Sequence, residues 1–105
     1  MQIQINTDKN VSGHEALAQS VEDVLRRVLS RFSDQITRIE VHLSDENSAA
    51  KSGMTDKRCL LEVRLAGLQP IAVSEQAQTV GQAVTGAAQQ MVHLLETELG
   101  KRGKH

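Results

Sequence analysis

The segment that most constrains the fold is residues 12–32, SGHEALAQSVEDVLRRVLSRF. Its apolar residues recur at three- and four-residue steps, at Leu17, Val21, Val24, Leu25, Val28, Leu29 and Phe32. That spacing predicts an amphipathic helix whose apolar stripe must pack against another layer of structure. Ser12 and Glu15 have the spacing of a capping box, which predicts where the helix begins.

The remaining apolar patterns predict four strands and a second helix. Residues 2–6, 36–43, 59–66 and 71–74 alternate between apolar and polar side chains or are rich in β-branched residues, so we expect short strands there. Residues 44–58 lack apolar periodicity and are expected to form a loop. Residues 80–99 have helical periodicity, with Thr79 and Gln82 at capping-box spacing and Gly100 at the expected C-terminal cap.

This order, β-α-β-β-β-α, predicts an α+β protein with one domain over residues 1–105. We expect a four-stranded mixed sheet with both helices packed on one face. The first two strands are joined through a helix and should be parallel if they are neighbours, whereas the later connections are hairpins. The basic residues within 100–105 are expected to form a flexible tail.

Composition excludes several classes of function. Cys59 is the only cysteine, so no disulfide can form within the chain, and a reducing cytoplasm is expected. No apolar run approaches the roughly 20 residues that span a membrane, and because residues 2–6 are expected to form a strand, no signal peptide is expected. The net charge is −1, so any nucleic-acid site must be a local patch. Phe32 is the only aromatic residue, which rules out an aromatic platform for base stacking.

No motif predicts catalysis, a metal site or a cofactor. The four histidines have no metal-ligand spacing with one another or with Cys59, and no glycine-rich loop follows a strand. Cys59 follows Arg58, but a buried structural thiol is favoured because no base is placed to activate it. We therefore expect a protein that is not an enzyme, with no small-molecule substrate.

Several short segments resemble the short ribosome-hibernation proteins of bacteria, which include the ribosome-associated inhibitor and the hibernation-promoting factor. The resemblance rests on MQIQI at residues 1–5, EAL at 15–17, RVLSRF at 27–32, the strand at 36–43 and the Ala83-Val84 pair. It covers nearly the whole chain. The element order described above is also that of the family.

The resemblance implies a translation inhibitor that binds the small ribosomal subunit and its 16S rRNA through basic helix residues. The candidate RNA-binding residues are Arg26, Arg27, Arg31, Lys101, Arg102 and Lys104. Acids four residues earlier, Glu22 and Asp23, are expected to neutralise Arg26 and Arg27, which leaves Arg31 as the strongest candidate.

A second hypothesis arises where the sequence departs from the family pattern. The second helix has Gly81, Thr85, Gln89, Gln90 and His93 where the family has an aromatic residue, acids and lysines. The alternative is therefore a protein of the same fold that has lost RNA binding and acts as a protein-interaction module. Its sheet face, its edge strand or its last helix would then mediate contact with another protein or formation of a homodimer.

Overall fold

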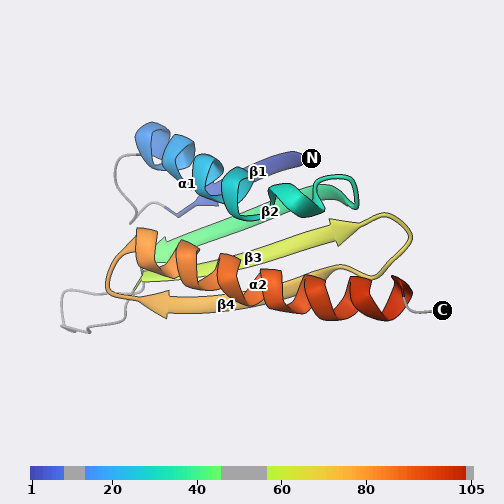
Figure 1. Cartoon of the computed structure of the whole chain (residues 1–105). Helices are drawn as coiled ribbons and strands as arrows, with labels where there is room; N and C mark the ends of the chain where they lie inside the picture. Colours follow the sequence, from blue (N-terminus) through green and yellow to red (C-terminus); the bar gives the residue numbers. More distant parts are fainter. Residues whose placement is uncertain (9–13, 46–56, 104–105) are drawn as a thin grey trace.

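The computed structural model of the chain describes residues 1–8, 14–45 and 57–103. The elements follow the predicted order: β1 (Gln2–Thr7), α1 (His14–Val28), a 3₁₀ turn (Ser30–Phe32), β2 (Ile36–Asp45), β3 (Lys57–Leu65), β4 (Ile71–Ala77) and α2 (Val80–Gly103). Both helices cover the same face of the sheet (Figure 1). The predicted α+β class and element order are confirmed.

The sheet has the strand order β1-β2-β3-β4. β1 runs parallel to β2, with Ile3 opposite Ile39, because α1 carries the chain back across the sheet between them. β2–β3 and β3–β4 are antiparallel, as the hairpin connections predict. The turn after β3 contains Gly67, the only described residue with a positive φ, at 74°. Glycine adopts that conformation without steric cost.

The core lies between the sheet and the two helices. Its buried side chains are Val21, Leu25, Leu29, Phe32, Ile36, Ile39, Val41, Leu43, Cys59, Leu61, Val63, Leu65, Ala83, Val84, Ala87, Ala88, Met91 and Leu95. The small residues of α2 allow it to lie close to the sheet, and no polar side chain among the described residues is buried. Burial of this apolar area is the main force that holds both helices on the sheet.

The helix expected over residues 12–32 is shorter in the structure. α1 ends at Val28, and the chain then tightens into a 3₁₀ turn in which the Phe32 amide donates to the Leu29 carbonyl at 3.0 Å. This turn places Phe32 in the core, where it is 8% exposed. The tighter winding is common at helix ends. Ser12 of the expected capping box lies outside the described residues.

The strands are longer than predicted. β2 and β3 include residues 44–45 and 57–58, which were assigned to the loop, because Ser44 pairs with Arg58 and Asp45 with Lys57. The rest of that loop, residues 46–56, lies outside the described residues. β4 continues to Ala77, because its pairing with β3 extends to the Lys57–Ala77 pair. A register shift between Ile36 and Arg38 allows both Ile36 and Ile39 to face the core, which simple alternation would not permit.

The predictions for the second helix are correct at its start and wrong at its end. The Gln82 amide donates to Thr79 Oγ1 at 3.1 Å, which confirms Thr79 as the N-terminal cap. α2 does not stop at Leu99, and Gly100 does not adopt the left-handed conformation of a C-terminal cap. Helical structure continues to Gly103, since a glycine within a helix lowers its stability by only about 1 kcal/mol.

Candidate functional site

The outer surface of the helix layer holds the candidate RNA-binding residues of α1. An open groove of about 450 Å³ runs between the end of α1 and the middle of α2. We call it the α1–α2 groove, lined by Arg27, Val28, Ser30, Arg31, Gln89 and Val92. The core stripe of α1 fixes the position of this groove, because burial of Val21, Leu25 and Leu29 turns the arginines outward.

Arg26 has the partner that the sequence predicts. Its Nε donates to Glu22 Oε2 at 2.9 Å, one helical turn earlier. Both side chains are exposed, so this ion pair contributes at most about 0.5 kcal/mol to stability. Arg26 is therefore largely neutralised on the surface of α1, and it does not line the α1–α2 groove.

Arg27 does not have the partner that the sequence predicts. Asp23 instead accepts a hydrogen bond from Gln19 Nε2 at 3.0 Å. Within the part of the chain that the structure describes, no carboxylate pairs with Arg27. The Arg27 side chain is exposed and lines the groove. It is thus a cation that can bind an anionic group without first breaking an ion pair.

Arg31 is paired where the sequence predicts a free cation. Its guanidinium contacts Glu96, which lies on α2, 65 residues later in the chain. The same guanidinium lies over the Phe32 ring at 4.7 Å from the ring centre, a cation–π arrangement. Within the described residues, Arg27 is thus the groove arginine without a carboxylate partner, whereas Arg31 is paired with a glutamate of the neighbouring helix.

The basic residues near the C-terminus are only partly placed. Lys101 and Arg102 belong to the last turn of α2, whose backbone is helical to Gly103. Lys104 lies outside the described residues.

The opposite face of the sheet is polar and internally paired. Arg38 contacts Glu40 at 3.0 Å, and Arg64 contacts Glu62 at 3.4 Å. Arg38 lies opposite Arg64 and Glu40 opposite Glu62, so each charge pairs along its own strand rather than across the sheet. The hydrogen bond from Arg38 lowers the pKa of Glu40. The charges of these two arginine–glutamate pairs therefore cancel on this face.

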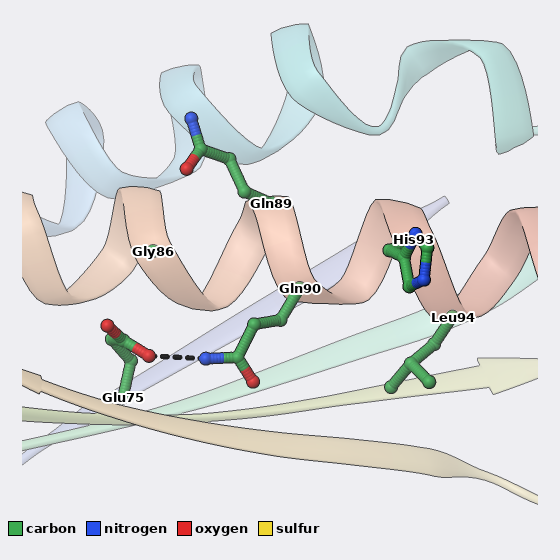
Figure 2. A pocket seen from close by; sticks show the side chains of 6 residues that line it. All are labelled: Glu75, Gly86, Gln89, Gln90, His93 and Leu94. Carbon is green, nitrogen blue, oxygen red and sulfur yellow. Dashed lines mark hydrogen bonds between the residues drawn. The ribbon is translucent and has the colours of Figure 1, made fainter.

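A second hollow of about 550 Å³ lies between α2 and the edge strand β4 (Figure 2). Its lining residues are Glu75, Gly86, Gln89, Gln90, His93 and Leu94, and no lysine or arginine is among them. Gln90 donates to the Glu75 carboxylate, and Gly86 provides the space above it. An rRNA phosphate would meet a carboxylate here, so this side of α2 does not favour RNA.

The structure gives no support for a metal or thiol site. Among the described residues, no group of three or more His, Cys, Asp or Glu side chains is close enough together to bind a metal ion. Cys59 is 1% exposed, and burial raises the pKa of its thiol to about 12. The interpretation of Cys59 as a buried structural residue is therefore confirmed. No described helix is long and apolar enough to cross a membrane.

Comparison with known proteins defines the class to which this α+β domain belongs. Residues 3–102 match the family described as "Sigma 54 modulation protein / S30EA ribosomal protein". The chain belongs to this family, and the resemblance to the ribosome-hibernation proteins is thereby confirmed. The family consists of ribosome-associated factors and is not a known class of enzyme.

Two solved structures show the same fold. The N-terminal domain of Protein Y from Thermus thermophilus superposes with a TM-score of 0.71 and 23% identity, over 92% of this chain and 98% of that domain. A ribosomal subunit interface protein from Coxiella burnetii gives a TM-score of 0.67 and 24% identity, over 97% of both chains. No curated protein sequence matches the chain significantly.

Sequence reasoning missed two acidic residues that shape these surfaces. The sequence does not indicate Glu96 as a partner of Arg31, because the two are 65 residues apart and no local spacing connects them. Glu75 occupies an inward position of β4, where alternation with Ile71 and Val73 predicts an apolar side chain. A charged residue at an apolar position is a signal that can be found in the sequence alone. On α2, the absence of a side chain at Gly86 leaves the space that the Glu75 side chain fills.

Proposed function

We propose that the chain inhibits translation by binding the small ribosomal subunit, with Arg27 contacting an rRNA phosphate at the α1–α2 groove. The observation that carries the proposal is the exposed Arg27 guanidinium, which has no carboxylate partner among the described residues. Membership in a family of ribosome-associated proteins supports the ribosome as the partner. It also implies that the protein acts in the cytoplasm.

Electrostatics predict that binding is local and sensitive to salt. The net charge of −1 provides no attraction by the protein as a whole, so affinity must come from a few phosphate contacts. Each neutralised phosphate contributes about 0.7–0.9 to the slope of log affinity against log salt. We assign the central contact to Arg27 and supporting contacts to Lys101, Arg102 and Lys104.

The test compares two arginine substitutions on opposite faces of the molecule. Purified small subunits are sedimented with the wild type, Arg27→Gln and Arg64→Gln at several salt concentrations. Arg64 is the matched control, because it is an exposed arginine on the polar sheet face, paired with Glu62. Both variants change the net charge equally, so any difference between them reports on location.

We expect Arg27→Gln to weaken binding several-fold at low salt and to reduce the salt slope by about one unit. Arg64→Gln should bind like the wild type. Equal losses in the two variants would show that only net charge matters. Absence of wild-type co-sedimentation at low salt would refute the proposed function.

Self-association is the second candidate function, favoured by the two open edges of the sheet. In the described part of the chain, β1 and β4 each have a neighbouring strand on one side only. The exposed positions of β4, Ala72, Ser74 and Gln76, carry no charge that would oppose pairing with a second strand. Sedimentation equilibrium tests this candidate, since a stable dimer without affinity for ribosomes would favour it over the first proposal.

A further inference from the structure

Among the residues that the structure describes, Glu96 is the acidic side chain that contacts an arginine of the α1–α2 groove. We propose that Glu96 competes with rRNA phosphate for Arg31 and thereby limits how tightly, and through how many phosphates, the chain binds the ribosome. The inference rests on the proposed function and adds a residue of α2 that sets its strength.

The Arg31–Glu96 pair is placed to act on the groove rather than to hold the fold together. The two side chains are 57% and 52% exposed, so the pair is solvated and contributes at most about 1 kcal/mol to stability. The helices that carry it are held by the buried core, in which Leu29 and Met91 are 0% exposed. Removal of the Glu96 charge should therefore leave the fold intact.

The guanidinium of Arg31 is already oriented for an anion. The Phe32 ring supports one side of it at 4.7 Å, and Phe32 is itself fixed in the core. Arg31 lies in the 3₁₀ turn that follows α1, four residues after Arg27, and both residues line the same groove. Two guanidinium groups that line one groove would form a site for two successive phosphates. Glu96, however, is paired with the second guanidinium group, that of Arg31.

The expected effect follows from the charge of one carboxylate. Two unit charges 4 Å apart in water interact strongly enough to change an equilibrium constant about fivefold. Replacement of Glu96 by glutamine removes the repulsion of phosphate and releases Arg31. Binding to the small subunit should therefore tighten about fivefold at low salt, and the salt slope should steepen by about 0.7–0.9 for the added phosphate contact.

Glu98 is the matched control, because it lies on the same helix two residues later and therefore about 200° around the helix axis from Glu96. No ion pair or hydrogen bond of its side chain is recorded in the described structure. Glu98→Gln changes the net charge by the same amount as Glu96→Gln. It should have little effect on affinity or salt slope if location, and not charge alone, is decisive.

The experiment measures co-sedimentation with purified small subunits for five proteins: wild type, Glu96→Gln, Glu98→Gln, Arg31→Gln and the Arg31→Gln/Glu96→Gln double variant. Glu96→Gln should bind more tightly than wild type, and most of that gain should vanish in the Arg31→Gln background, because Glu96 acts through Arg31. Far-UV circular dichroism confirms that each variant is folded.

The outcomes separate this inference from the proposed function. If Arg27→Gln weakens binding while Glu96→Gln binds no more tightly than wild type, the inference fails and the proposed function stands. Weaker binding by Glu96→Gln would mean that Glu96 positions Arg31 instead of masking it, which also overturns the inference. If neither the wild type nor Glu96→Gln binds small subunits, both proposals fail.

Discussion

We expect Cys59 to make this protein less stable at alkaline pH. The thiol lies in β3, within the core between the sheet and the helix layer, and the residue is 1% exposed. Burial raises its pKa from an ordinary value of 9.0 to about 12, and the Glu75 carboxylate on the neighbouring strand adds to the rise. The Cys59 thiol therefore stays protonated in the folded state at pH values where the same thiol is ionised in the unfolded chain.

The sign and size of the effect follow from proton linkage. The contribution of the neutral thiol to stability is fully present below about pH 9 and is lost as pH rises from about 9 to 12, since the unfolded state gains by ionising. Within this window the free energy of unfolding falls by about 1.4 kcal/mol per pH unit. Between pH 8 and pH 10 the loss is therefore about 1.4 kcal/mol.

Urea unfolding at pH 8 and pH 10 measures this loss. The chain has no tryptophan or tyrosine, so far-UV circular dichroism is the appropriate probe. Cys59→Ala is the control, because it lacks the thiol but retains the lysines, which titrate in the same range. The wild type should lose about 1.4 kcal/mol more than Cys59→Ala between the two pH values. Equal losses, or rapid modification of the folded protein by a thiol reagent at pH 8, would refute the reasoning.

The remaining predictions concern α2. Gly81→Ala should stabilise the protein by about 0.5–1 kcal/mol through helix propensity, since only Thr79 Oγ1 lies within 4.0 Å of the added methyl group. Gly86→Ala should gain less or destabilise, because its methyl group would lie 2.8 Å from Glu75 Cγ; thermal unfolding that shows equal gains would contradict this. Thr79→Ala should cost about 1 kcal/mol by removing the N-terminal cap, whereas Thr79→Ser should retain most of it, again by thermal unfolding.

The fold was predictable because its signals are local and repeated. The stripe that includes Val21 and Leu25 can be buried only as a helix, and the alternation through Ile39 and Val41 only as a strand with one face covered. The element boundaries were less accurate. Strand pairing extends β2 and β3 into the expected loop, and α2 continues past Gly100, because long-range contacts outweigh local preference.

The site was predictable only in part. The sequence identified the basic residues of α1 and the local pair Glu22–Arg26, because residues four apart on a helix are neighbours in any fold. It could not show which of Arg27 and Arg31 is paired with a carboxylate. The partner of Arg31 comes from α2, and only packing of the two helices on one sheet face brings Glu96 to it.

The amino-acid sequence by itself therefore determined which segments become helices and strands and which charges lie on the surface of α1. Those properties depend on side-chain periodicity, which acts over a few residues. The tertiary structure decided which of these charges remains unpaired, because electrostatic interactions depend on distance in space and not on separation along the chain. Burial of the core sets the spacing between α1 and α2, and that spacing leaves Arg27 open and pairs Arg31 with Glu96.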